Sequence, residues 1–210
     1  MRRKSTSNPW GWAALLALVA IASRSSSSAK RRPRDVHWSD DDMKAFQMAV
    51  EASGVPIDAV LQVYASESGL DPAASAGTAW GLPQFIATTL RGIGWKDAPS
   101  RFADLSVAQQ APWIGRLLKS QVAYLGYVPQ SAVELYAVNF WPAAARRRED
   151  VILVRDSQDA RERDAYVKNA GLDRARKGWI SREDLQTSLN RVAKLPALER
   201  ARAQVRRLAA

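Results

Sequence analysis

Apolar residues recur at helical spacing through most of this 210-residue chain, and this periodicity constrains the fold more than any other feature. Met43, Phe46 and Val50 share one face of a predicted helix, which begins after an N-cap at Ser39 and stops at Gly54. Strand-like alternation is scarce. The pattern therefore predicts a mainly α fold.

Proline and glycine residues divide the following part of the chain into further predicted helices. They cover, in chain order, residues 56–68, 83–92, 106–125 and 130–140. Pro112 is expected to kink or restart the helix over 106–125. The loop between the first two of these helices is expected to hold no more than a small irregular hairpin.

Composition divides the chain into four predicted segments. The apolar run at residues 10–22 is shorter than the ~20 residues of a membrane-spanning helix, and an A-x-A site precedes Ser23. We predict a signal peptide at 1–22, with a short membrane anchor as the alternative because basic residues follow. A basic, Ser-rich linker occupies residues 23–38. We expect residues 39–142 to form a helical domain that folds by itself, and residues 143–210 to form a helical C-terminal extension.

Composition also excludes several kinds of chemistry. The chain has no cysteine, so it has no disulfide and no thiolate nucleophile or ligand. Its one histidine, His37, cannot form a multi-histidine metal site, and a histidine-activated serine is hard to build. Carboxylate chemistry remains. The net charge of +10 favours a polyanionic partner, but no nucleic-acid-binding motif accompanies it, so specific nucleic-acid binding is not predicted.

Glu67 stands at the end of a predicted apolar helix and is followed by a loop of small residues. A carboxyl group there feels the negative end of the helix dipole. Apolar neighbours such as Tyr64, Leu70 and Trp80 would remove it from water. Both effects favour the protonated form, which can act as a general acid near neutral pH.

The stretch "ESGLDPAASAGTAWGLPQF", with the later "LYAVNFWP", resembles the soluble lytic transglycosylase family, which has a lysozyme-like fold. The matching blocks are Glu67-Ser68, Pro72, Ser75, the GLPQ run that ends at Gln84, and the turn at Asn139. The resemblance covers about residues 39–142. It implies that Glu67 is the catalytic acid and base, and that Ser75, Gln84 and Asn139 line the glycan cleft.

Two positions depart from the family pattern. Pro83 replaces the usual Met, and Val138 stands where the family has a Tyr before the Asn. Tyr136 precedes Asn139 by three residues, so both could face the same cleft on a helix. We therefore add Tyr136 to the predicted substrate-binding residues, with a core aromatic as the alternative. The "YAVNFWPA" run looks closer to phage-borne or prophage-borne relatives.

The resemblance implies cleavage of the β-1,4 bond between N-acetylmuramic acid and N-acetylglucosamine in peptidoglycan, with a 1,6-anhydro product. It implies no metal and no organic cofactor. The expected location is periplasmic or otherwise extracytoplasmic, with membrane association through residues 10–22, or alternatively a phage virion. Three other functions stay open: a lysozyme-like hydrolase of the same bond, a non-catalytic wall-binding or virion structural protein, and a basic nucleic-acid binder.

The stretch "GLDRARKGWISREDL" has the outline of a calcium-binding helix-loop-helix. Asp173 and Gly178 stand at its first and sixth positions. Ala175 and Lys177 occupy places that need oxygen ligands, and Asp184 replaces the final Glu. Because a lysine cannot coordinate a cation, we predict a structural loop that binds no ion.

Overall fold

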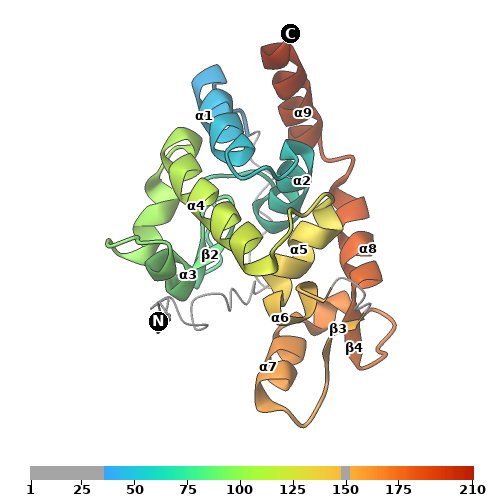
Figure 1. Cartoon of the computed structure of the whole chain (residues 1–210). Helices are drawn as coiled ribbons and strands as arrows, with labels where there is room; N and C mark the ends of the chain where they lie inside the picture. Colours follow the sequence, from blue (N-terminus) through green and yellow to red (C-terminus); the bar gives the residue numbers. More distant parts are fainter. Residues whose placement is uncertain (1–35, 148–151) are drawn as a thin grey trace, which may run out of the picture.

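The computed structural model describes residues 36–147 and 152–210, and it confirms the mainly α fold class. Helices form most of the molecule, with two small sheets among them (Figure 1). The predicted signal peptide or anchor at 1–22, its apolar run at 10–22, and nearly all of the linker at 23–38 lie outside the described residues. Among the described helices, none has the length and apolar character that a membrane span requires.

The helical elements of the described residues follow one another closely along the chain. They are α1 (Asp40–Glu51), α2 (Ile57–Ser68), α3 (Ala87–Gly92), the 3-10 helix η1 (Pro99–Asp104), α4 (Val107–Leu125), α5 (Ala132–Phe140), α6 (Pro142–Ala145), α7 (Ala160–Asn169), the 3-10 helix η2 (Ala170–Leu172), α8 (Arg182–Val192) and α9 (Pro196–Ala209).

Capping explains where the long helices begin. The Ser39 side chain accepts a hydrogen bond from the Asp42 backbone, and the Asp42 carboxylate accepts one from the Ser39 backbone, which completes a capping box at α1. Ser106 and Gln109 form the same arrangement at α4. The three apolar residues predicted to lie on one face of α1 are fully buried.

One predicted helix start was wrong, and one of the two alternatives predicted at Pro112 is excluded. The helix predicted over 83–92 begins only at Ala87, because Gln84 has a left-handed φ of 51° and Phe85 belongs to a strand. No restart occurs at Pro112, since α4 runs unbroken with this proline in its second turn. The Pro112 side chain is exposed.

Both sheets are antiparallel and two-stranded. Strands β1 (Ala79–Trp80) and β2 (Phe85–Ile86) form the small hairpin that was expected in the loop after α2, with Trp80 paired to Phe85. Strands β3 (Ile152–Arg155) and β4 (Trp179–Ser181) pair within the C-terminal extension. The sequence analysis did not predict this second sheet, because its strands lie in a segment rich in charged residues.

Helix α2 lies at the centre of the molecule. It contacts α1, α5, α8 and α9, and these helices surround it in Figure 1. Six of its twelve residues are buried. Helix α1 also packs along α4. The central position of α2 fixes where its last turn, and therefore Glu67, can lie.

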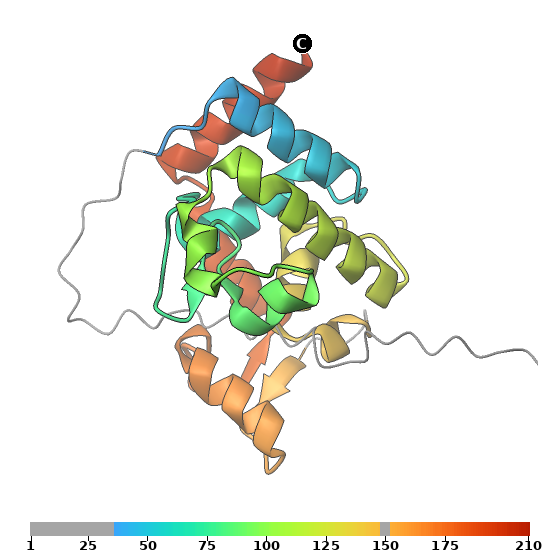
Figure 2. The same ribbon diagram turned by 90° about the vertical axis from the view of Figure 1, so that its left-hand side faces the viewer.

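The C-terminal extension shares the same core. Leu185 and Leu189 of α8 and Leu198 of α9 are fully buried within one continuous cluster that includes the residues of α1 and α2. Figures 1 and 2 show α9 beside α1 at one end of the molecule. Arg202 of α9 donates to Asp58 of α2, with Nε and Oδ1 2.6 Å apart. The extension is therefore packed against the predicted domain, not joined to it by a linker alone.

A chain that ends at Ala145 tests whether residues 39–142 fold by themselves. Because each buried leucine side chain contributes about 1.5–3 kcal/mol, removal of α8 and α9 should cost most of the stability of a domain this size. We expect no sharp thermal unfolding transition by circular dichroism. A chain lacking only the exposed Ala209 and Ala210 is the control. A sharp transition close to that of the whole chain would instead support the independent domain.

Candidate active site

The end of α2 places Glu67 at a sharp reversal of the chain. Gly69 adopts a left-handed conformation with φ 67°, and its N–H donates to the Ala65 carbonyl, which closes the helix. Leu70 follows with φ 65°, a conformation that costs a side-chain-bearing residue about 1 kcal/mol or more. The Leu70 side chain is buried, and Trp38 Nε1 donates to its carbonyl at 3.1 Å. These contacts hold the turn directly after Glu67.

One buried amide holds the loop that follows. Gln110 of α4 is fully buried, and its Oε1 accepts from the Leu82 N–H at 2.9 Å. Its Nε2 donates to the Pro72 carbonyl at 2.8 Å and to the Leu105 carbonyl at 3.1 Å. Gln110 thereby ties both ends of the loop to α4 and η1. The sequence analysis missed this residue, although a glutamine on the apolar face of a long helix was the available signal.

Gly81 is required by close packing in this loop. It has φ 75°, and a Cβ atom there would lie 2.7 Å from both Phe102 Cδ1 and Gln110 Oε1. Any side chain would have to displace the buried amide or the ring. The glycine of the GLPQ run is thus explained by the geometry of the loop itself.

Gln84 and Ser75 lie in the same loop but in different environments. Gln84 is buried, and its Nε2 donates to the carbonyls of Gly81 at 2.9 Å and Ala74 at 3.3 Å. Ser75 is exposed and forms an isolated bridge with Trp80. The Gln84 side chain thus stabilises the loop that carries the exposed Ser75.

Asn139 is attached to a different helix. It is buried on α5, and its Oδ1 accepts from Gln121 Nε2 of α4 at 2.6 Å. Gln121 is a second buried amide that the sequence analysis did not single out. Among the described residues, no hydrogen bond joins Ser75, Gln84 or Asn139 to Glu67.

Tyr136 is the predicted site residue that the structure brings to Glu67. Its ring is fully buried on α5, and its hydroxyl lies close enough to the Glu67 carboxyl to lower the pKa of that group. Val138 is also fully buried. Tyr64, one turn before Glu67, borders the carboxyl group as well.

Three buried polar atoms at this place lack partners. Glu67 Oε1 and the hydroxyl oxygens of Tyr64 and Tyr136 have no hydrogen bond of normal geometry within the described part of the chain. A buried polar atom without a partner costs about 1–3 kcal/mol. Such atoms are rare in folded proteins, and their grouping makes this place the candidate site.

Burial sets the protonation state of Glu67. Removal from water raises its pKa from 4.5 to about 8, and the nearby Tyr136 hydroxyl only partly opposes this. The group is therefore mostly protonated at neutral pH. The sequence analysis predicted this direction, and desolvation is its cause.

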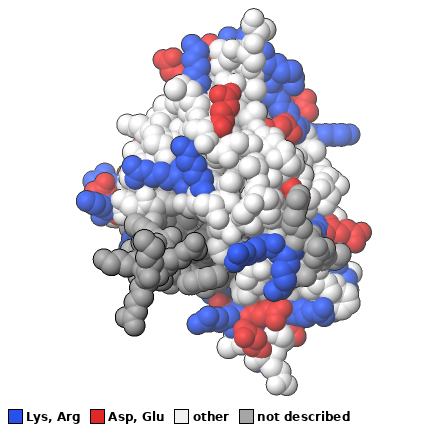
Figure 3. Space-filling view, in the orientation of Figure 1, with Lys and Arg blue, Asp and Glu red and all other residues white. Residues whose placement is uncertain are grey.

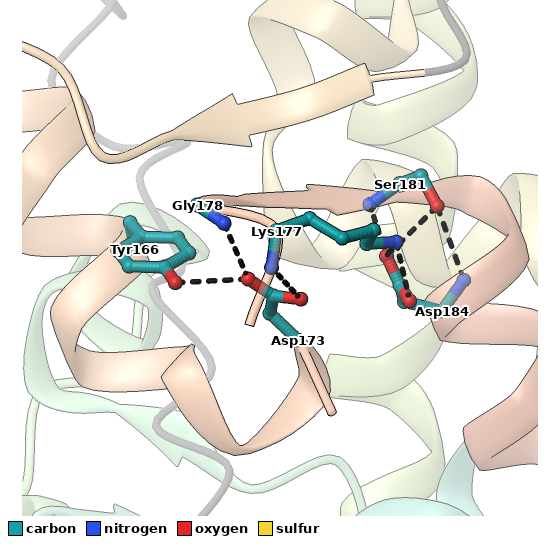
Figure 4. A network of polar contacts seen from close by, with 6 residues as sticks. All are labelled: Tyr166, Asp173, Lys177, Gly178, Ser181 and Asp184. Atoms are coloured by element: carbon teal, nitrogen blue, oxygen red, sulfur yellow. Dashed lines mark hydrogen bonds and ion pairs between the residues drawn. The ribbon is translucent and has the colours of Figure 1, made fainter. Parts of the chain in front are cut away.

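The structure explains why the calcium-like loop does not fit a cation (Figure 4). Lys177 Nζ donates to both carboxylate oxygens of Asp184, at 3.0 and 2.8 Å. Asp173 accepts from the backbone of Lys177 and Gly178 and from the Tyr166 hydroxyl, each at 2.8 to 2.9 Å. The lysine ammonium group thus forms an ion pair with the carboxylate that a bound metal ion would require as a ligand. Elsewhere in the described chain, no cluster of three acidic or histidine side chains is arranged to hold a metal ion.

No protein-family model, curated protein sequence or solved structure matches this chain. The function must therefore be argued from the residues of the site and their chemistry. The observations that bear on it are the protonated carboxyl group of Glu67, its two tyrosine neighbours, and the braced loop beside them.

We expect calcium to have no effect on residues 173–184, because Lys177 already neutralises Asp184. Calorimetric titration should detect no site there, and calcium should not change the melting temperature. Lys177→Met should reduce stability more than Lys168→Met, since the Lys177 and Asp184 side chains are 26% and 14% exposed while Lys168 and Asp164 are both 49% exposed. A micromolar calcium site in the unaltered chain would contradict this assignment.

Proposed function

We propose that this chain is a peptidoglycan lytic transglycosylase in which Glu67 is the general acid and base. The observation that carries the proposal is the buried carboxyl group of Glu67, whose pKa is raised to about 8 beside an unpartnered tyrosine hydroxyl. An ordinary surface glutamate is ionised at neutral pH and cannot donate a proton. This one is held in the form that a glycosidic oxygen requires.

The raised pKa suits both steps of the proposed reaction. Protonated Glu67 first gives its proton to the oxygen of the breaking glycosidic bond, so that the alcohol leaves without forming an alkoxide. The resulting carboxylate then accepts a proton from the hydroxyl group that attacks the anomeric carbon. A group with a pKa near the working pH can serve both steps, because neither transfer is strongly uphill.

The other acidic candidates give little support for a second catalytic carboxylate. Common retaining and inverting glycosidases need one as nucleophile or as base. Asp71 Oδ1 accepts from the Ala73 N–H at 2.9 Å and so caps a turn in the loop, and Asp97 is exposed. A single carboxyl group fits a mechanism in which the 6-hydroxyl of N-acetylmuramic acid attacks its own anomeric carbon. The proposed product is therefore the 1,6-anhydro sugar.

A polyanionic, extracytoplasmic wall polymer fits the charge of the chain better than a nucleic acid does. On the face drawn in Figure 3, basic and acidic side chains are interspersed around a broad uncharged area. Several basic groups are also paired, such as Arg202 with Asp58 and Arg207 with Asp40. A nucleic-acid binder would be expected to collect its free arginines along one stripe.

Glu67→Gln is expected to abolish cleavage of purified peptidoglycan. The amide keeps the size of the side chain but can neither donate nor accept the proton, so the loss should reach at least ~10²–10⁴-fold. Glu51→Gln, at an exposed position on α1, is the matched control and should keep full activity. Retained cleavage by Glu67→Gln would refute the proposed role.

Mass spectrometry of the digest identifies the reaction. We expect muropeptides that end in 1,6-anhydro-N-acetylmuramic acid. Products heavier by one water, with free reducing ends, would show a lysozyme-like hydrolase acting on the same bond. Absence of any cleavage by the unaltered chain would favour a non-catalytic wall-binding protein.

Glu67→Gln should also stabilise the protein at alkaline pH. Because the folded-state pKa is about 8 and the ordinary value is 4.5, the folded state binds more protons between these values, and stability falls as pH rises through this window. The cost above pH 8 is on the order of a few kcal/mol. Thermal unfolding should therefore show a gain for Glu67→Gln at pH 9 that disappears below about pH 4.5. An equal effect at both pH values would contradict the raised pKa.

A further inference from the structure

Trp38 joins the chain before α1 to the turn that follows Glu67. Its indole N–H donates to the Leu70 carbonyl at 3.1 Å, although 32 residues separate the two in the sequence. Leu70 comes directly after Gly69, the residue that ends α2, and its left-handed φ of 65° is unfavourable for a residue with a side chain. The hydrogen bond to its carbonyl therefore holds a strained backbone at the point where the chain leaves Glu67.

The ring of Trp38 leads toward Glu67 by a second route. Its centroid lies 5.1 Å from that of Phe46, and the two rings meet edge to face at 65°. Phe46 meets Tyr64 in the same way, with the centroids 6.2 Å apart and the rings at 66°. Tyr64 stands one turn before Glu67 and borders its carboxyl group. Because aromatic pairs favour this geometry, the row of rings helps to fix the side of α2 that carries the acid.

Helix α9 of the extension holds the backbone of Trp38. Gln204 Nε2 donates to the Trp38 carbonyl at 3.1 Å and to Asp40 Oδ1 at 2.9 Å. Arg207 Nη1 donates to Asp40 Oδ2 at 3.1 Å. Figures 1 and 2 show α9 running beside α1, where these contacts lie. The extension thus fixes the short segment from which the indole reaches the turn.

Packing alone does not hold the indole and the turn in place. A small hollow borders both, and it is lined by Trp38, Leu70 and three residues of α9 (Ala197, Ala201 and Gln204), among others. The Trp38 side chain is only half-buried. Side chains that line a hollow lose packing contacts on that side. The directional bond from the indole N–H is therefore needed to set the position of the Leu70 carbonyl.

We propose that Trp38, held in place by Gln204, is a positioning residue of the active site, which acts on Glu67 by fixing the backbone turn at Leu70. Its catalytic meaning rests on the function proposed above. Trp38 belongs to the predicted linker and α9 to the extension, so both lie outside residues 39–142, which the family resemblance covers. The active site accordingly depends on contacts from both sides of the predicted domain.

Release of this turn would change the surroundings of the Glu67 carboxyl group. Removal from water is the main cause of its raised pKa, so a turn that moves and admits water would lower this pKa from about 8 toward 4.5. The titratable groups that border the carboxyl are Tyr64 from α2 and Tyr136 from α5. Trp38→Phe removes neither hydroxyl group, and the charges nearest to it, on Asp40 and α9, stay in place. A lower pKa in this variant therefore reports the turn.

The test is the pKa of Glu67, measured by carbon NMR of the side-chain carboxyl groups and assigned by loss of the signal in Glu67→Gln. Trp38→Phe keeps an aromatic ring against Phe46 but loses the N–H, and it should lower this pKa. Trp95→Phe is the matched control. It removes an indole N–H that donates to the Ala98 carbonyl at 3.3 Å in the segment between α3 and η1, and it should leave the pKa unchanged.

A second variant tests the role of α9. Gln204→Met keeps the length of the side chain but cannot donate to the Trp38 carbonyl. It should lower the pKa of Glu67 by a smaller amount, and it should have no further effect in the Trp38→Phe background. Gln186→Met, which removes a hydrogen bond to Asn190 at 2.8 Å on the exposed face of α8, is its matched control. If Trp38→Phe does not fold, this pair decides the question.

The proposal is overturned if Trp38→Phe unfolds in a sharp thermal transition yet leaves the pKa of Glu67 unchanged, or lowers it no more than Trp95→Phe does. Because one net hydrogen bond is worth a factor of roughly two to ten, kcat for peptidoglycan cleavage should fall by that factor in Trp38→Phe, with KM unchanged. The titration needs no activity. A lowered pKa in a protein that cleaves nothing would keep the positioning contact and refute the proposed function alone.

Discussion

Burial of α2 on nearly every side is the constraint on which the rest of this structure depends. Helices α1, α5, α8 and α9 all contact it, and half of its residues are removed from water. Glu67 stands in the last turn of this helix, where Gly69 and Leu70 reverse the chain. The packing that stabilises the fold therefore also supplies the low dielectric that keeps the carboxyl group protonated.

Several energetically unfavourable features lie at this end of α2. Leu70 has a left-handed backbone angle, and the polar atoms of Tyr64, Glu67 and Tyr136 are buried without partners in the described chain. Each feature costs about 1–3 kcal/mol. A sequence selected for stability alone would replace them with apolar side chains and glycines. Their concentration at one place supports a role in function. Proteins depart from the rules of stable folding mainly at functional sites, where the chemistry requires the unfavourable group.

The sequence predicted the helices whose signals are local. Ser39 caps α1 as expected, and α4 runs to Leu125 as predicted, since a cap and an apolar stripe are set by residues within one or two turns. The roles of Gln110 and Gln121 could not be predicted, because the hydrogen-bond partners of these buried amides lie far from them in the sequence. The start of α3 was missed for a related reason: the pairing of Phe85 with Trp80 overrides the helical preference of its segment.

In the extension, a lysine ammonium group stands where a calcium-binding loop would hold its ion. In a calcium-binding loop, the ion draws the carboxylates together and so sets the angle of the helix that follows. Here the Lys177 ammonium group binds the Asp184 carboxylate instead. The same carboxylate also accepts a hydrogen bond from Ser181, the N-cap of α8. Helix α8 then packs its buried Leu185 and Leu189 against α5, the helix that carries Tyr136. Because a lysine takes the place that an ion would have in this loop, the start of α8 is held by groups of the chain itself.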